Sequence, residues 1–163
     1  MGLSDSQIVP RHELKSLVQD HKQRGQSVVF ANGCFDVLHV GHLRYLEAAR
    51  EEGDILIVAI NSDSSVRNLK GAGRPILDEH ARARLVAALR AVDYVLIFTD
   101  TSVASLLEEL RPHVHAKGTD YTVESVPEGA TANSLGIRVA IVGDPKDHST
   151  KALLESVRKA PHA

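Results

Sequence analysis

Short apolar runs alternate with helix-length amphipathic segments along the whole chain, and this alternation limits the fold more than any other feature. The runs span residues 27–31, 54–60, 94–98, 113–116 and 137–142. Most of them are almost continuously apolar and lack the alternation of polar and apolar residues found in a half-exposed strand. Continuous apolar runs are typical of parallel strands covered on both faces. Strands that alternate with helices predict a parallel sheet with right-handed crossovers.

Helical patterns fill the stretches between these runs. We expect helices over 10–25, from Gly41 to Gly53, from an N-cap at Asp78 to residue 89, over 103–110 behind a cap at Thr101 or Ser102, and over 149–159. The prediction is therefore a single-domain α/β fold, a Rossmann-like parallel five-stranded sheet with helices on both faces. Residues 1–25 are predicted to form an N-terminal helical extension, and residues 26–163 the domain itself.

Composition excludes several classes of protein. Nineteen Lys and Arg against 21 Asp and Glu give a net charge of -2, which argues against a broadly basic nucleic-acid binder. The longest apolar run, 55–60, is far too short to span a membrane, and residues 1–10 have neither the charged start nor the apolar block expected of a secretory signal. A single cysteine, Cys34, cannot form an intramolecular disulfide. We expect a cytoplasmic protein that binds neither nucleic acid nor membrane.

The stretch 31–42, ANGCFDVLHVGH, carries the most chemistry. The first strand ends in a glycine-containing turn, and a helix begins near Gly41, so unpaired backbone N–H groups face any anion placed there. His39 and His42 lie three residues apart, which puts both imidazoles on one helix face if the helix starts at or just before His39. Imidazoles donate hydrogen bonds to phosphate oxygens. We predict a phosphate site; half of a zinc site and a plain surface pair are the alternatives.

Polar residues also follow the later strands, at the sheet edge where such folds bind ligands. Asn61 and Asp63 suit a ribose or sugar hydroxyl, although for Asp63 the cap of a helix from Ser64 is the preferred interpretation. Residues 117–121, KGTDY, suit a base or sugar, or simply form a turn closed by Asp120. Ser149 and Thr150 begin the last helix, either as a second anion site or as its cap.

A basic glycine-containing loop follows the second strand–helix unit. Lys70 and Arg74 flank Gly71 and Gly73 there, and mobile positive charge suits closure over a triphosphate. An ordinary solvated loop is the alternative. Arg82, early in the next helix, is read either as a substrate contact or as surface charge.

The segment NGCFDVLHVGHLRYLEAAR resembles the start of the cytidylyltransferase-like nucleotidyltransferases, whose signature is His-x-Gly-His after the first strand. Within them the chain is most similar to the heptose 1-phosphate adenylyltransferase domain of ADP-heptose synthases. Further matches are AINSDSSVRNLKG at 59–71, RP at 74–75, AVDYV at 91–95, KGTDY at 117–121 and HST at 148–150. The third position of the family's Ser-Thr-Thr is Lys151 here, which departs from the pattern.

This resemblance implies roles for named residues. The expected catalytic residues are His39, His42 and Lys70. The expected nucleotide-binding residues are Asn32, Gly33, Cys34, Phe35, Gly41, Arg74, Lys117, Gly118, Asp120, Ser149 and Thr150. The expected substrate-binding residues are Asp36, Asn61, Asp63, Arg82 and Tyr121. Mg²⁺ is the implied cofactor, bridging phosphate oxygens without a metal site of the protein's own. The implied partners are ATP, a sugar phosphate and, since relatives are commonly dimers, a second copy.

The implied reaction is adenylyl transfer. A sugar phosphate oxygen attacks the α-phosphorus of ATP in line, pyrophosphate leaves, and D-glycero-D-manno-heptose 1-phosphate gives an ADP-sugar. The alternative enzyme is a cytidylyltransferase that acts on glycerol 3-phosphate or another polyol phosphate, and a nucleotide-binding module without activity is a third reading. Cys34 is expected to pack rather than act as a nucleophile, and His113 and His115 are expected to be structural.

Overall fold

The computed structural model describes residues 7–145 and 148–160. Residues 1–6 of the predicted N-terminal extension, and residues 146–147 and 161–163 of the predicted domain, lie outside the described residues. The described strands form one sheet of five, all parallel, in the order β3-β2-β1-β4-β5. This confirms the predicted sheet. Its strands are β1 (Val28–Gly33), β2 (Ile55–Asn61), β3 (Tyr94–Phe98), β4 (Val114–Gly118) and β5 (Arg138–Val142).

The strand order places a topological switch between β1 and β4. From β1 the chain moves outward through β2 to β3, then returns to pair β4 with the free side of β1. In open parallel sheets, ligands bind beyond the carboxyl ends of the strands at such a switch. The segments after Gly33 and Gly118 therefore lie where a ligand is expected.

Seven α-helices are described, and most match the predicted segments. They are α1 (Arg11–Gln23), α2 (Val40–Glu51), α3 (Asp63–Lys70), α4 (Glu79–Ala87), α5 (Ala104–Leu110), α6 (Gly129–Ser134) and α7 (Thr150–Lys159). The 3₁₀-helix η2 (Val123–Ser125) and α6 were not predicted. Both are short, and α6 consists of Gly, Ala, Thr, Asn and Ser, several of which favour helices weakly.

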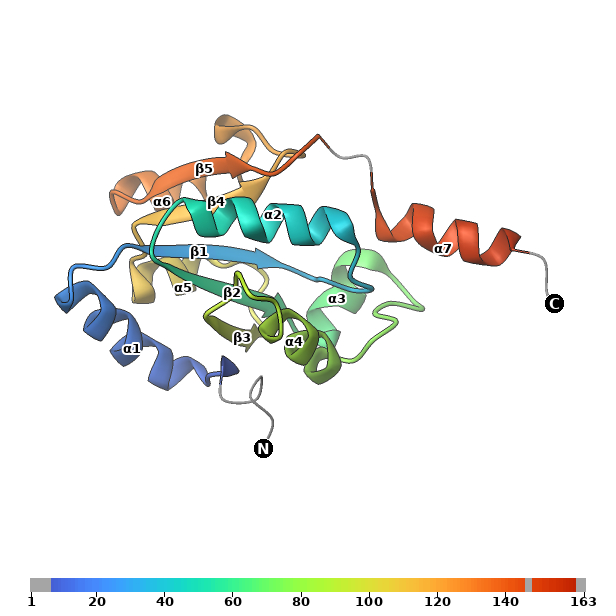
Figure 1. Cartoon of the computed structure of the whole chain (residues 1–163), viewed down its shortest axis with the longest axis horizontal. Helices are drawn as coiled ribbons and strands as arrows, with labels where there is room; N and C mark the ends of the chain where they lie inside the picture. Colours follow the sequence, from blue (N-terminus) through green and yellow to red (C-terminus); the bar gives the residue numbers. More distant parts are fainter. Residues whose placement is uncertain (1–6, 146–147, 161–163) are drawn as a thin grey trace.

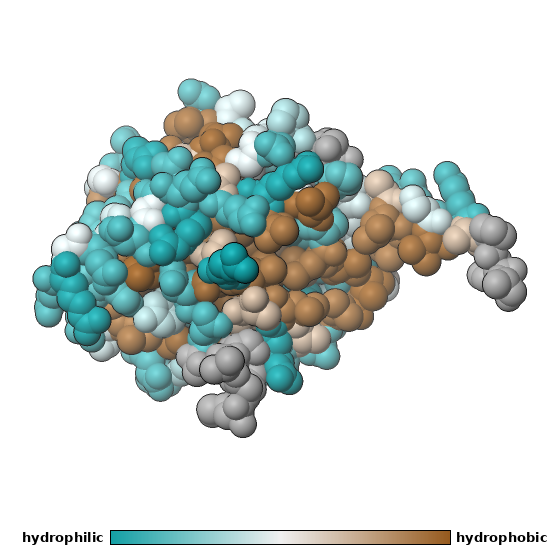
Figure 2. Space-filling model, in the orientation of Figure 1, coloured by the Kyte–Doolittle hydropathy of each residue, from teal (hydrophilic) through white to brown (hydrophobic). Residues whose placement is uncertain are grey.

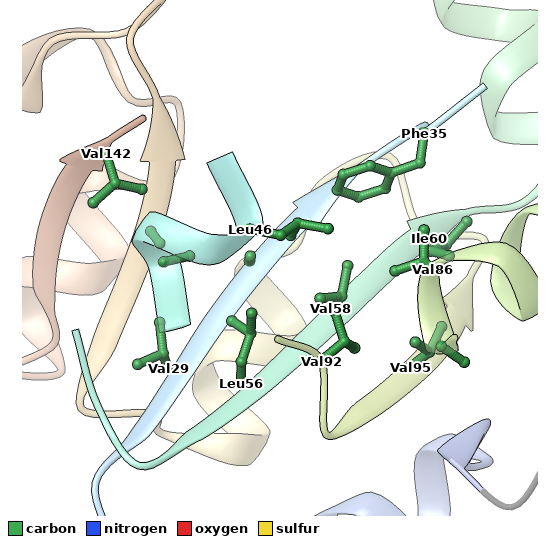
Figure 3. Close-up of a cluster of buried hydrophobic side chains, with 14 of the residues drawn as sticks. Val29, Phe35, Leu46, Leu56, Val58, Ile60, Val86, Val92, Val95 and Val142 are labelled. Atoms are coloured by element: carbon green, nitrogen blue, oxygen red, sulfur yellow. The ribbon is translucent and has the colours of Figure 1, made fainter. Parts of the chain in front are cut away.

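Two hydrophobic cores cover the two faces of the sheet, which explains why the strands are apolar throughout. Successive residues of β1 point to opposite faces, so Val29 and Ala31 pack under α2 and α4 while Val28 and Phe30 pack under α1, α5 and α6. Figure 3 shows the first core, where Leu46 of α2 lies over the sheet. The predicted helices on both faces are confirmed.

The two terminal helices differ in how they join this body. The predicted N-terminal extension packs on the sheet, because α1 buries Leu14 and Val18 in the second core. By contrast, α7 has no buried residue and extends away from the sheet (Figure 1). Figure 2 shows apolar surface continuing from the body onto this helix, where Leu153 and Val157 are exposed. None of the helices described is long and apolar enough to cross a membrane.

Candidate active site

The two histidines of the His-x-Gly-His segment stack on each other at the start of α2. The ring centroids of His39 and His42 lie 3.9 Å apart, with 24° between the ring planes. This confirms that the spacing brings both imidazoles together on one side of the helix start. The ring of Phe35, at 5.3 Å from that of His42, packs against the pair from the preceding turn.

His39 is itself the N-cap of α2, and this fixes its chemistry. Its Nδ1 accepts a hydrogen bond from the backbone N–H of Gly41, at 3.2 Å. A neutral imidazole that accepts at Nδ1 carries its proton on Nε2, so Nε2 is the atom of His39 that can donate to an anion. A Cβ at position 41 would lie 3.0 Å from this ring. Gly41 therefore makes room for the imidazole of His39.

The turn between β1 and α2 contains strained backbone. Phe35 and Val37 have φ angles of 49° and 58°, in the left-handed region that residues with a Cβ rarely adopt. For a β-branched residue such as Val37 this conformation is a true outlier. Each such residue costs on the order of 1–3 kcal/mol and persists only where the surroundings over-determine it, typically at a functional site.

Asp36, between these two residues, supplies much of that constraint. It is 2% exposed, and its carboxylate accepts from the N–H groups of Ile76 and Leu77 and, at 2.6 Å, from the guanidinium of Arg74. Burial would raise the pKa of Asp36, but these three donors hold it below its usual range. The carboxylate thus ties the basic loop to the turn. Arg74, the predicted nucleotide contact, has its Nε committed to this link.

Arg82 also stabilises the turn between β1 and α2, through hydrogen bonds made by its buried guanidinium. Its side chain is fully buried and donates to the carbonyl oxygens of Cys34 (2.6 Å) and Leu77 (3.0 Å) and to Asp63 Oδ1 (2.8 Å). The surface-charge reading of Arg82 is therefore wrong. These three bonds direct the guanidinium to other residues of the protein, so the side chain supports the turn rather than facing solvent.

Lys70 and Cys34 lie near each other at this turn. Lys70 is the last residue of α3 and is exposed. Burial raises the pKa of the Cys34 thiol, and the charges of Lys70 and Arg82 oppose that shift. A thiol with a raised pKa is a poor nucleophile, in agreement with the packing role expected for Cys34. Lys70 is left as a cation at the rim of the turn.

The residues at the end of β2 and just after it have two roles: one caps α3, and the others make contacts that support the site. Asn61 is buried and donates to Ser65 Oγ at 3.0 Å. The expected cap at Asp63 is wrong, because Ser62 is the N-cap of α3 and accepts from the Ser65 N–H. Asp63 instead pairs with Arg82, while its own N–H donates to Glu79.

Ser149 and Thr150 connect α7 to the site. Ser149 is the N-cap of α7, as the cap alternative predicted, and accepts from the Ala152 N–H. Thr150 donates its hydroxyl hydrogen to the carbonyl oxygen of Asp36 at 2.8 Å. A shallow hollow beside them is lined by His39, His148, Ser149, Ala152, Leu153 and Ser156.

A second cluster of polar side chains lies at the carboxyl end of β4. Lys117 is 6% exposed, and its Nζ lies 4.5 Å from the ring centroid of Tyr121 and 3.9 Å from Oε2 of Glu128. Burial lowers the pKa of Lys117, and the carboxylates of Glu128 and Asp120 oppose this. Gly118 lies beside it, and a Cβ there would lie 2.9 Å from Asp120 Oδ1, so that carboxylate would have to shift.

The two histidines near β4 are structural, as expected. His113 Nδ1 accepts from the Val28 N–H at 2.9 Å, and the buried ring of His115 contacts Phe30 while its Nε2 lies 3.1 Å from Asn32 Oδ1. Burial, together with the charge of Lys117, lowers the pKa of His115 to about 3. The ring is therefore neutral at physiological pH.

This shift predicts an acid-sensitive fold. The pKa of this histidine is about 6.5 in the unfolded chain. At a pH between that value and the folded pKa, the unfolded chain binds one proton more than the folded chain. The free energy of unfolding therefore falls by about 1.4 kcal/mol for each unit by which the pH is lowered in this range. We expect His115→Gln to remove that slope between pH 6 and pH 4 in urea titrations. The exposed His80→Gln should keep it, and a slope shared by wild type and His115→Gln would contradict the assignment.

Glu128 is the main site residue that sequence reasoning missed. It lies in the turn just before α6, a helix that was not predicted, and no motif marks it. Among residues 7–145 and 148–160, no three His, Cys, Asp or Glu side chains gather in a way that could hold a metal ion.

Most of the chain is similar to known proteins. The family model described as cytidylyltransferase-like matches residues 30–154. The chain is 46% identical to the bifunctional protein HldE of Pelobacter propionicus over 154 residues, and 42% identical to that of Pseudomonas aeruginosa over 156 residues. These alignments cover 94% and 96% of this chain but 32% and 33% of the relatives, so the chain spans about a third of their length.

Solved structures show the same fold. A lipopolysaccharide core biosynthesis protein from Thermoplasma volcanium superposes with a TM-score of 0.65 at 30% identity, covering 75% of this chain and 100% of that one. Pantothenate synthetase from Thermus thermophilus reaches 0.68 at 17% identity, covering 94% and 70%, which supports the fold alone. The stacked histidines at the switch point and the family match lead to one conclusion: the chain belongs to the cytidylyltransferase-like family and is a nucleotidyltransferase.

Proposed function

We propose that this enzyme transfers AMP from ATP to a sugar 1-phosphate, D-glycero-D-manno-heptose 1-phosphate, and releases pyrophosphate. The observation that carries the proposal is the stacked pair of His39 and His42 at the N-terminus of α2, beside the switch point. The similarity to HldE proteins and to a lipopolysaccharide core biosynthesis protein supports a sugar acceptor.

The geometry suits charge stabilisation rather than covalent catalysis. A sugar phosphate is already an anionic nucleophile, so the protein needs to align two anions and to neutralise charge on the transferred group. His39 Nε2, the N-terminus of α2 and Lys70 surround the turn and supply donors and positive charge. The Asp36 and Arg82 contacts keep that turn in its strained conformation, which pre-organises the donors.

Mg²⁺ enters this proposal as part of the nucleotide substrate. The carboxylate of Asp36 is engaged by Arg74 and by two backbone N–H groups, so it is not offered to a cation. Mg²⁺ commonly keeps several waters and is held largely by substrate phosphates. We expect the ion to arrive with ATP and to reduce the charge that the histidines and Lys70 must offset.

A pyrophosphate-release panel tests the proposal. ATP and CTP are each combined with heptose 1-phosphate, glycerol 3-phosphate and other sugar phosphates, with MgCl₂ present. We expect the highest kcat/KM for ATP with heptose 1-phosphate. Preference for CTP with glycerol 3-phosphate would replace the proposed acceptor with the polyol phosphate, and nucleotide binding without pyrophosphate release would indicate a binding module.

A further inference from the structure

Two oppositely charged side chains are buried together beyond β4 without a hydrogen bond between them. Lys117 and Glu128 are 6% and 7% exposed, yet Nζ and Oε2 stand 3.9 Å apart. Glu128 Oε1 accepts from Ser102 Oγ at 3.3 Å, whereas Oε2 has no hydrogen-bond partner. Lys117 Nζ also lies over the ring face of Tyr121.

Such an arrangement is costly in a finished protein interior. Buried charges are normally both paired and hydrogen-bonded, and a buried polar atom without a partner calls for a missing ligand or water. Here a donor and an acceptor face each other across a gap that is too long for a direct bond. The gap therefore offers a hydrogen-bond donor on one side and an acceptor on the other, as a binding site for one small polar group would.

A hydroxyl group satisfies both atoms at once. It donates to the carboxylate oxygen and accepts from the ammonium, and an oxygen about 2.8 Å from each atom fits the separation with an angle of about 90°. A phosphate oxygen would be repelled by Glu128, and an apolar group would leave the buried Glu128 Oε2 without a partner. Polyols and sugars are the ligands that present such hydroxyls.

The cluster lies across the sheet from the stacked histidines. Along β4, Ala116 belongs to the core under α2, while His115 contacts Phe30 in the core under α1 and α5. Because strand residues alternate, Lys117 points to the same side as His115. Glu128 adjoins it as the residue before α6, on that same side of the sheet.

We propose that Lys117 and Glu128 bind a hydroxyl group of the acceptor sugar, with the ring of Tyr121 packing against the same ligand. The acceptor then approaches from the α5 and α6 side, the nucleotide phosphates lie on the α2 side, and the two meet over the turn after β1. This assignment rests on the proposed function, and it moves Lys117 from the nucleotide to the acceptor.

The experiment compares Glu128→Gln with wild type, using Glu124→Gln as the matched control. Glu124 is an exposed carboxylate in η2, so the control removes the same charge from the same segment. Initial rates of pyrophosphate release give KM separately for ATP and for heptose 1-phosphate. We expect Glu128→Gln to raise the acceptor KM about 10- to 100-fold, since a hydrogen bond to a charged group is lost, and to leave the KM for ATP unchanged. Glu124→Gln should change neither.

Deoxy analogues of the acceptor locate the hydroxyl. For wild type, one monodeoxy sugar phosphate should bind more weakly than the parent sugar, and Glu128→Gln should abolish that difference. A change in both KM values, or an unchanged acceptor KM in a folded Glu128→Gln protein, overturns the assignment and leaves the gap to a water molecule. If Glu128→Gln does not fold, Glu128→Asp keeps the charge but withdraws the oxygen, and the same acceptor-specific rise is required.

Calorimetry separates this inference from the proposed function. If no sugar phosphate supports pyrophosphate release, the proposed function fails, and binding of heptose 1-phosphate to the nucleotide-free protein decides the inference. Binding that Glu128→Gln weakens and Glu124→Gln preserves supports the hydroxyl site. An absence of sugar phosphate binding overturns it.

Discussion

Replacing His42 with alanine is expected to lower kcat about 10²-fold or more while the fold stays intact, because it removes one preorganised donor from the transferred phosphate. The ring of His42 stacks on that of His39 at 3.9 Å, so its loss also removes this stacking contact from the neighbouring imidazole. The effect should fall on kcat more than on the KM for ATP, since charge builds on the α-phosphate only in the transition state.

The measurement is pyrophosphate release under saturating ATP and acceptor, with circular dichroism and thermal unfolding as tests of the fold. His80→Ala is the matched control, because His80 is an exposed histidine on α4 and is not among the expected site residues. A folded His42→Ala protein with wild-type turnover would remove the imidazole pair from the chemistry.

The fold and the centre of the site were open to sequence reasoning because both depend on local pattern. Apolar runs indicate parallel strands covered on both faces, and the two cores show that covering directly. Histidines three residues apart at a helix start must lie close together, whatever the rest of the chain does. Geometry that follows from one strand, one turn and one helix is predictable in this way.

The support beneath the turn depends on residues distant in the sequence, and that is why it was harder to predict. Asp36 binds residues 38 to 41 positions away, and Arg82 reaches back 48 positions to Cys34. One signal for Arg82 was present: it precedes Val86 by four residues, so helical spacing places it on the buried face of α4 with Ala83 and Ala87. For Glu128 no comparable signal exists, because its partners Ser102 and Lys117 are brought to it only by the sheet.

Removing the Arg82 side chain is expected to destabilise the protein by about 3–5 kcal/mol, the range found when one partner of a buried ion pair is deleted. Arg82→Ala leaves the carbonyl oxygens of Cys34 and Leu77 and the Asp63 carboxylate without their donor, and it opens a cavity under the turn. Urea unfolding measures the change. Arg90→Ala, at an exposed position just after α4, should stay within about 0.5 kcal/mol of wild type.

A double-mutant cycle with Asp63 distinguishes loss of the ion pair from general damage to the core. Asp63→Ala leaves Arg82 as an uncompensated buried charge, so the double variant should be less destabilised than the sum of the two single variants. Additive effects would mean that the carbonyl contacts and packing, rather than the ion pair, account for the stability.

In either case Arg82→Ala should lower kcat in the fraction that remains folded. The strained backbone at Phe35 and Val37 persists only while its surroundings enforce it. The histidine pair follows that backbone into α2, so relaxation of the turn would move the imidazoles.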